Sequence, residues 1–154
     1  MDLVYLRLDD VINTHRRTVE VSGGGVLGHR DLGIIESALA HIQNDDYYPS
    51  FIDKITHLFF ACNKFHCFED GNKRIAISAS TRFLLDNGYV FAASRFISQM
   101  ENISYHVAAG VIDKKFLRDL IEAAIHDELD DNEDLKIRLI EALSQKLPGD
   151  EEPT

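Results

Sequence analysis

The first 65 residues carry apolar side chains at the three- and four-residue spacing of amphipathic helices. The three stripes are Val11, Ile12, His15 and Val19; Leu32, Ile35, Leu39 and Ile42; and Ile52, Ile55, Leu58, Phe59, Cys62 and Phe65. Asp9 and Asp10 stand where they would cap the first helix, and the glycine run 23–25 would end it. The turn-forming segment 44–50 separates the second helix from the third. The pattern therefore predicts three helices joined by short breaks.

The rest of the chain continues the helical pattern. A fourth helix is expected to begin behind the turn Gly71-Asn72 and to end at Asn87-Gly88, a residue pair suited to a C-terminal cap. Residues 89–91, Tyr-Val-Phe, are interpreted as a short extended piece. Further helices are expected near 95–109, 113–126 and 132–146. There is neither an internal repeat nor a linker, so the sequence predicts an all-α protein with a frayed acidic end.

Composition narrows the class of protein. The chain has 154 residues, 45% of them hydrophobic, with no apolar run long enough to cross a membrane and no secretion signal at its start. Cys62 and Cys67 are expected to be reduced thiols, which suits the cytoplasm. The other histidines, His57 among them, lack the spacing of a zinc site and are interpreted as surface or core residues.

Charge argues against nucleic acid as the main partner, because the formal net charge is −10 at pH 7. Much of this charge is local. Ten acidic and three basic residues lie from Asp127 onward, so that this segment alone carries −7. Any cationic site in the protein is therefore a local feature of an acidic chain.

The segment His66-Cys67-Phe68-Glu69-Asp70-Gly71-Asn72-Lys73-Arg74 carries most of the chemistry. A loop that turns at Gly71 and Asn72 and opens a helix presents backbone N–H groups and the positive end of the helix dipole, which together bind anions. Lys73 and Arg74 oppose that dipole, and their placement makes sense if an anion compensates them. The segment predicts a phosphate-binding site.

Two further residues could supply catalytic chemistry at this site, one as a proton acceptor and one as a metal ligand. His66 can accept a proton at neutral pH, although a histidine at a helix end can also serve only as a cap. Asp70 can hold a divalent cation against a phosphate, although an aspartate here can also be a plain capping residue. Glu69 is interpreted as a surface residue.

The same nine residues resemble the signature of the Fic/Doc superfamily, His-x-Phe-x-Asp/Glu-Gly-Asn-Gly/Lys-Arg. The specified positions are filled by His66, Phe68, Asp70, Gly71, Asn72, Lys73 and Arg74. AMP-transferring members usually have glycine at the position of Lys73 and a second arginine at the position of Ile77. The chain thus resembles the Doc, or death-on-curing, branch, except that the toxin which names this branch carries alanine where this chain has Gly71.

The resemblance implies a fold and a site. The fold is a compact bundle of about six helices over residues 1–126, with a short extended flap before the central motif; the acidic segment 127–154 lies outside the match and belongs to the same domain or is an appendage. The flap is assigned to the segment of Tyr47, Tyr48 and Pro49, which would pair with the backbone of a target protein; the alternative is an ordinary loop.

The resemblance also implies the role of each motif residue. His66 would take the proton from a hydroxyl of the target, and Asp70 would bind Mg²⁺. The phosphates of ATP would lie on Gly71, Asn72, Lys73 and Arg74. Phe68 would anchor the loop in the core.

The implied activity is phosphorylation of elongation factor Tu, which blocks translation. AMP transfer (AMPylation) of a protein hydroxyl is the alternative reaction, and a binding module that kept only the fold is an alternative of another class. No serine or threonine is followed four residues later by glutamate, so the chain lacks the self-inhibitory signature of many Fic proteins. A separate antitoxin is therefore the expected partner, with neither a nucleic acid nor a membrane. The acceptor residue, the antitoxin and the oligomeric state do not follow from the sequence.

Overall fold

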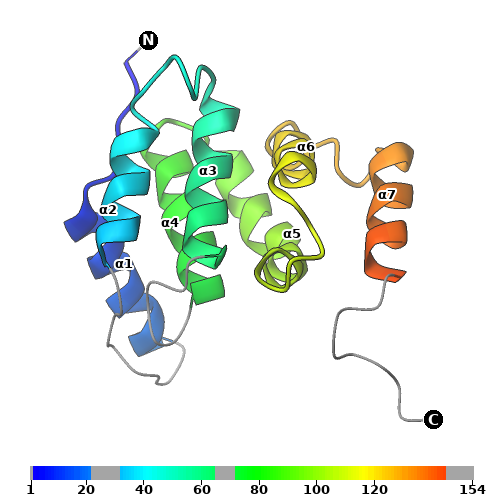
Figure 1. Ribbon diagram of the computed structural model, residues 1–154, viewed down its shortest axis with the longest axis horizontal. Coiled ribbons are helices and arrows are strands. Elements are labelled where there is room, and N and C mark those ends of the chain that lie inside the picture. The colour runs from blue at the N-terminus through cyan, green and yellow to red at the C-terminus, as the bar shows by residue number, and fades with distance from the viewer. Residues whose placement is uncertain (1, 22–31, 65–71, 145–154) are drawn as a thin grey trace.

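The computed structural model describes residues 2–21, 32–64 and 72–144, and Figure 1 shows its helices. Over these ranges there are seven helices and no strand, which confirms an all-α fold. The helices are α1 (Leu8–Val21), α2 (Leu32–His41), α3 (Phe51–Lys64), α4 (Asn72–Asp86), α5 (Val90–Ala108), α6 (Lys114–Ile125) and α7 (Glu133–Ser144).

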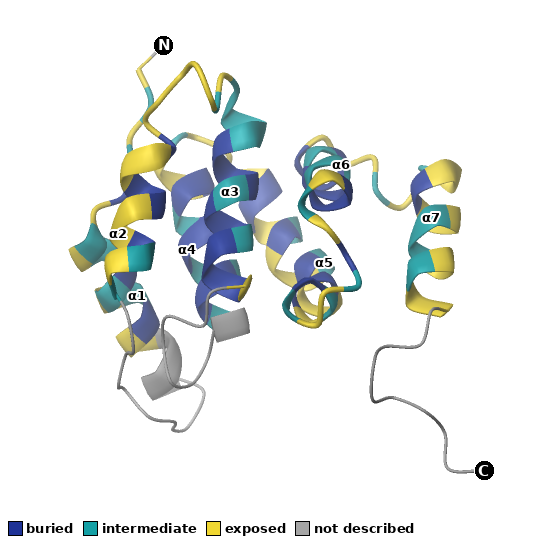
Figure 2. Cartoon of the chain, viewed as in Figure 1, coloured by how far each residue is buried: buried dark blue, intermediate teal, exposed yellow. Residues whose placement is uncertain are grey.

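Helices α3 and α4 form the centre of the bundle. Helix α4 packs against α1, α3 and α5, and α3 also packs against α2, α5 and α6. The buried faces of these helices turn toward one another, while α7 lies outermost beside α6 (Figure 2). Phe59 of α3 and Phe96 of α5 are fully buried and meet edge to face, with ring centroids 5.8 Å apart. This apolar centre holds the ends of α3 and α4 in a fixed relation.

The start of α1 shows how a predicted cap works in detail. The helix begins at Leu8, so Asp9 and Asp10 lie inside its first turn rather than before it. The carboxylate of Asp10 reaches back and accepts a hydrogen bond of 2.9 Å from the backbone N–H of Arg7. Asp10 therefore caps the helix from its third position.

The end of α4 follows the prediction, but the segment behind it does not. The N–H of Tyr89 donates to the carbonyl of Leu84 at 2.9 Å, and Gly88 adopts a φ of 88°, as in a Schellman cap. Residues 89–91 were predicted to be extended, and this prediction is wrong, because α5 begins at Val90. The cap turns the chain directly into α5. Val90 and Phe91 are 58% and 84% exposed in this helix. Their apolar side chains therefore do not indicate a buried strand.

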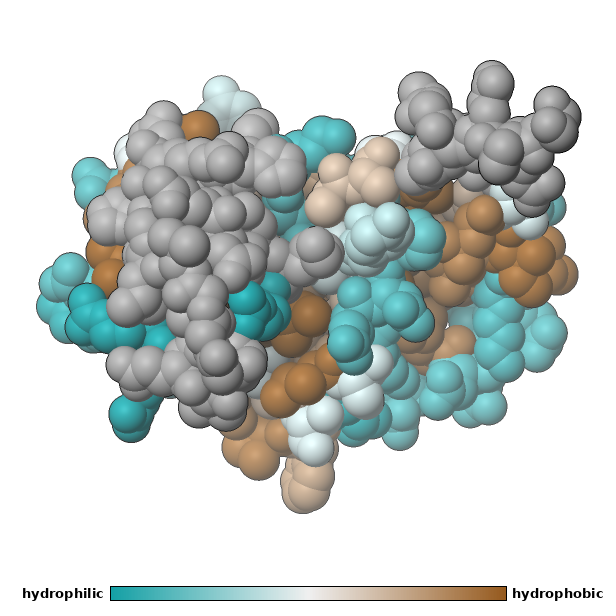
Figure 3. All heavy atoms as spheres, turned by 90° about the horizontal axis from the view of Figure 1, so that it is seen from below, coloured by the Kyte–Doolittle hydropathy of each residue, from teal (hydrophilic) through white to brown (hydrophobic). Residues whose placement is uncertain are grey.

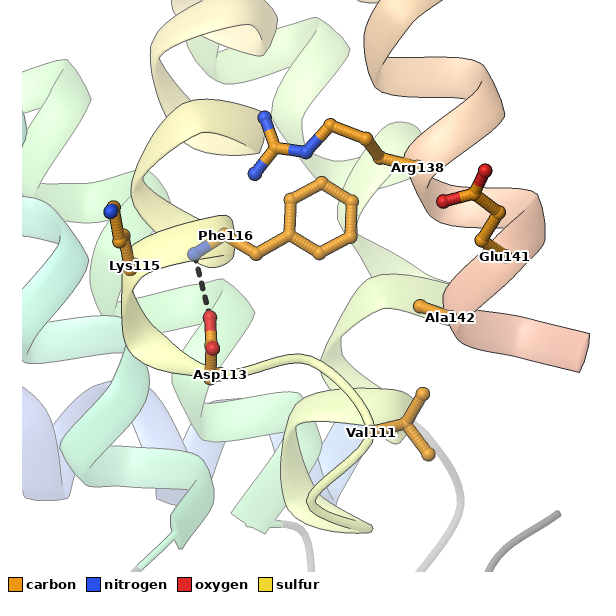
Figure 4. A pocket seen from close by; sticks show the side chains of 7 residues that line it. All are labelled: Val111, Asp113, Lys115, Phe116, Arg138, Glu141 and Ala142. Carbon is orange, nitrogen blue, oxygen red and sulfur yellow. Dashed lines mark hydrogen bonds between the residues drawn. The ribbon is translucent and has the colours of Figure 1, made fainter. Parts of the chain in front are cut away.

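Helix α7 packs on its own bundle through part of its apolar face. Leu135 is buried and Leu139 is partly buried against the core. Arg138 pairs with Asp119 of α6 at 3.0 Å. Its guanidinium lies over the ring of Phe116, 4.5 Å from the ring centroid; Figure 4 shows these two side chains. The helix is therefore held on α6 by a few contacts.

The outer face of α7 is apolar as well. Ile137, Ile140 and Leu143 are 54%, 63% and 44% exposed, and apolar surface is visible at this end of the molecule in Figure 3. The bundle therefore leaves part of the apolar surface of α7 uncovered.

A buried lysine fixes the turn before α3. The ammonium of Lys54 is 2% exposed and donates to the carbonyl of Ile42 and to Asp45 Oδ1, both at 2.7 Å. Burial lowers the pKa of Lys54, but its hydrogen bonds to Asp45 and Tyr5 outweigh burial and raise the pKa above the ordinary value. The turn is thus tied to the helix by a charged group.

Replacing Lys54 by methionine is expected to lower the free energy of unfolding by about 2 kcal/mol, because the buried carbonyl of Ile42 loses its donor. Urea denaturation followed by circular dichroism measures the change. Lys136→Met is the matched control, since Lys136 is exposed and its pair with Glu133, at 3.7 Å, is a surface pair. Equal stability of the two variants would show that Lys54 does not hold the turn.

Candidate active site

The motif is bracketed by two helix ends. Helix α3 ends at Lys64 and α4 begins at Asn72, so Asn72 and Lys73 are the first two residues of α4. The predicted residues His66, Asp70 and Gly71 lie outside the described residues, and their roles stay predictions.

Buried side chains hold the start of α4 in the core. Arg74 is half-buried in the first turn, and the next two residues, Ile75 and Ala76, are fully buried in the core. Since the first turn of a helix offers N–H groups without partners in the helix, this end is suited to an anion. The start of α4, where the phosphate site is predicted, is thus held in the core by Ile75 and Ala76.

A buried polar link holds the end of α3. The hydroxyl of Ser104 on α5 donates to Asn63 Oδ1 at 2.6 Å, and the side-chain amide of Asn63 donates to the carbonyl of Phe59 at 3.1 Å. Asn63 and Ser104 are fully buried. Such a pair specifies one arrangement of the two helices, because shifting either residue would leave a buried polar group unpaired. It fixes the point at which the chain enters the motif.

The predicted flap is a turn in the structure. The backbone N–H of Asp46 donates to the side-chain oxygen of Asn44 at 2.9 Å. The N–H of Tyr48 donates to the backbone carbonyl of Asn44, also at 2.9 Å. The side chain of Asn44 also receives the N–H of Tyr47 at 3.4 Å. Residues 44–48 are therefore not extended, because the asparagine closes the chain on itself.

The turn also lies far from the ends that bracket the motif. Tyr47, Tyr48 and Pro49 precede the first residue of α3, whereas the motif follows its last residue. Helix α3 has 14 residues, so these two places are about 20 Å apart along the helix axis. The structure does not bring the predicted flap and the motif ends together, and target docking by these residues stays a prediction.

Sequence reasoning missed a polar cluster beside this turn. Lys114 Nζ lies 2.7 Å from His57 Nδ1, and the hydroxyl of Tyr48 lies 3.3 Å from the same nitrogen. Next to them, Arg118 donates to Asp53 at 2.6 Å. Asp53 and His57 are four residues apart on α3, as Lys114 and Arg118 are on α6, so each pair lines one helix face. The four-residue spacing within each pair can be seen in the sequence. It does not show, however, that α3 and α6 pack against each other.

The environment of His57 keeps its ring neutral. Burial, the nearby ammonium of Lys114 and His41 lower the pKa of His57 from 6.5 to about 4. Among the described residues, no group of three histidine, cysteine or carboxylate side chains is arranged to hold a metal ion. His57 is thus a hydrogen-bond acceptor for Lys114.

Acid is expected to weaken the fold through His57. Between pH 6.5 and about 4 the unfolded chain binds a proton on this ring and the folded chain does not, so stability falls as the pH drops through this window. The loss is about 2 kcal/mol after allowing for solvent around a partly exposed ring. Urea denaturation at neutral pH and at about pH 4.5 measures it, with His57→Gln as the comparison. An equal loss in the variant would exclude His57 as the cause.

Comparison with known proteins defines the class. The sequence profile of the Fic/DOC family matches residues 5–84, more than half of the chain. A protein of Mycolicibacterium smegmatis named Toxin Doc is 33% identical over 108 residues, which cover 68% of this chain and 80% of that protein. The chain belongs to the Fic/DOC family, and this membership supports a Fic-type transferase activity. None of the described helices is long and apolar enough to span a membrane.

Proposed function

We propose that the protein is a Doc-like toxin, which transfers a phosphate-containing group from ATP to a hydroxyl of a protein target. Elongation factor Tu is the first target to test, and arrest of translation is the expected consequence. The observation that carries the proposal is the complete motif from His66 to Arg74 in a chain of the Fic/DOC family. The similarity to a protein named Toxin Doc supports the biological role.

The proposed chemistry is mainly positioning and charge stabilisation, as phosphoryl transfer requires. His66 accepts the proton of the target hydroxyl as that oxygen attacks phosphorus. Arg74 forms forked hydrogen bonds to phosphate oxygens, while Lys73 supplies a further positive charge. The amide of Asn72 and the N–H groups at the start of α4 complete the anion site.

A Mg²⁺ ion fits the donors that the motif offers. Mg²⁺ takes oxygen ligands and usually only one or two protein carboxylates, so Asp70 together with phosphate oxygens and water suffices. The half-buried Arg74 in the first turn of α4 is compatible with a phosphate at that end. When bound, the ion would neutralise charge that develops on the phosphates.

Phosphorylation is preferred over AMP transfer because of two positions. Lys73 and Ile77 replace the glycine and the second arginine that AMP-transferring relatives usually carry. Ile77 is partly buried against the core of the bundle, an environment in which a charged side chain would lose solvation. AMP transfer by the same motif is the second candidate reaction.

A separate antitoxin is the proposed regulator. The chain lacks the self-inhibitory serine or threonine followed by glutamate, so another protein would have to keep the transferase inactive. The name of the similar toxin is consistent with such a pair.

Controlled expression in bacteria tests the toxin proposal. Induction of the wild-type chain is expected to stop growth and incorporation of labelled methionine into protein, whereas induction of His66→Ala leaves both unchanged. Growth arrest by both proteins at equal soluble levels would show that toxicity does not depend on transfer.

A further inference from the structure

A cavity of about 400 Å³ lies between the turn before α3 and the first turns of α3 and α6. Its walls include Tyr47 and Tyr48 from the turn, Thr56 from α3 and Lys114 from α6. This volume is in the range of small-molecule sites. The cavity lies at the beginning of α3, whereas the motif follows the last residue of that helix in the sequence.

The cavity contains the half-buried ammonium of Lys114, which has no ion-pair partner among the described residues. Lys114 Nζ lies 5.3 Å above the ring of Tyr48 and 5.8 Å above that of Phe60, and its hydrogen-bond partner, His57, is neutral at pH 7. Within the described part of the chain, no carboxylate lies within ion-pair distance of Lys114. Burial accordingly lowers the pKa of Lys114, although the charge of Asp53 acts in the opposite direction.

Arg118, which lines the same cavity, differs from Lys114 because it has ion-pair partners. Arg118 is paired with two carboxylates, Asp53 at 2.6 Å and Glu122 at 3.0 Å. The ion pair between α3 and α6 fixes one wall of the cavity, and leaves Lys114 and the exposed Lys115 as the cations that can act on a ligand. These two lysines are the first residues of α6, where positive side chains oppose the helix dipole.

The remaining walls are suited to a ring. Tyr47 is 79% exposed at the mouth of the cavity, and the ring of Tyr48 lies against His57 with centroids 4.7 Å apart. The hydroxyl of Thr56 is buried and has no hydrogen-bond partner among the described residues. A cation in an aromatic cavity favours a ligand that combines a negative group with a planar apolar part.

We propose that this cavity binds an oxyanion, either phosphate or carboxylate, that is attached to an aromatic ring. The oxyanion would be held by Lys114, and the ring would pack against Tyr47 and Tyr48. Such a ligand supplies the counter-charge that a partly buried ammonium requires. The residues of the cavity are distinct from those of the motif, although Tyr47 and Tyr48 also belong to the predicted flap.

Phenyl phosphate and benzoate are the probes, with inorganic phosphate as the ring-free comparison. Titration calorimetry of the full chain is expected to show that phenyl phosphate binds more tightly than inorganic phosphate. Lys114→Met is expected to weaken binding about 10- to 100-fold through loss of a charged hydrogen bond. In the wild type, NMR signals of the His57 ring are expected to shift on addition of either aromatic probe, because His57 contacts Lys114.

Lys136→Met controls for loss of one positive charge, since Lys136 lies on α7 and pairs with Glu133. Unchanged affinity in Lys114→Met, or an equal loss in Lys136→Met, would overturn the site. Equal affinity for phenyl phosphate and inorganic phosphate would overturn the role of the aromatic wall. If Lys114→Met does not fold, the wild-type NMR titration decides: signals of His57 that stay unchanged at saturating probe would contradict the proposal.

Discussion

Replacing His66 by alanine is expected to reduce the rate of transfer about 10²- to 10⁴-fold, the usual effect of removing a general base. The proton of the target hydroxyl would then have no acceptor within the motif, while the phosphate-binding residues 71–74 would remain. Initial rates with labelled ATP and a purified acceptor protein measure the effect. ATP affinity, measured separately, is expected to change little, because His66 is assigned to the proton and not to the phosphates.

His126→Ala is the matched control for this variant. His126 is exposed at the C-terminal end of α6, and no role in transfer is assigned to it. The control is expected to react at the wild-type rate. A His66→Ala protein that is folded and reacts as fast as the control would remove His66 from the mechanism.

Replacing Arg74 by alanine is expected to reduce transfer about 10²- to 10³-fold, as is typical when one preorganised donor to a developing charge is lost. Arg74 lies in the first turn of α4, directly before the buried Ile75. Because the helix is held by its buried side, a change at Arg74 should leave the backbone in place. Arg74→Lys is expected to recover only part of the rate, since lysine keeps the charge but loses the forked contact.

Arg82→Ala is the comparison on the same helix. Arg82 pairs with Asp10 at 3.4 Å and with Asp86 at 3.6 Å, and its side chain is 41% exposed. Loss of such surface pairs costs little stability and should not affect transfer. Equal rates for the two alanine variants would place the phosphates elsewhere than at the start of α4.

Most of the helices could be predicted from the sequence because each has one apolar face toward the core. The start of α5 could not be predicted, because Val90 and Phe91 face solvent there and do not continue an apolar helix face. Valine and aromatic residues favour strands, so the segment was predicted to be extended. The turn before α3 was predicted as a break but not as a closed turn. Its form depends on the three hydrogen bonds to Asn44, which residue preference alone does not specify.

The motif could be predicted because its residues are contiguous, so that chemistry and spacing are visible together. The cluster of His57 and Lys114 could not, because its two residues lie far apart in the sequence and meet only when α3 packs on α6. The same reason applies to Asn63 and Ser104, whose buried hydrogen bond joins α3 to α5. Tertiary packing, which single-sequence patterns do not contain, creates both features.

We propose that this chain phosphorylates a hydroxyl of elongation factor Tu by means of His66. Intact mass spectrometry of purified elongation factor Tu, after incubation with the chain, ATP and Mg²⁺, tests it most directly. The wild type is expected to add the mass of one phosphoryl group, and His66→Ala is expected to add none. A gain of the mass of one AMP group, or an unchanged mass under conditions in which the wild type arrests translation, would contradict it.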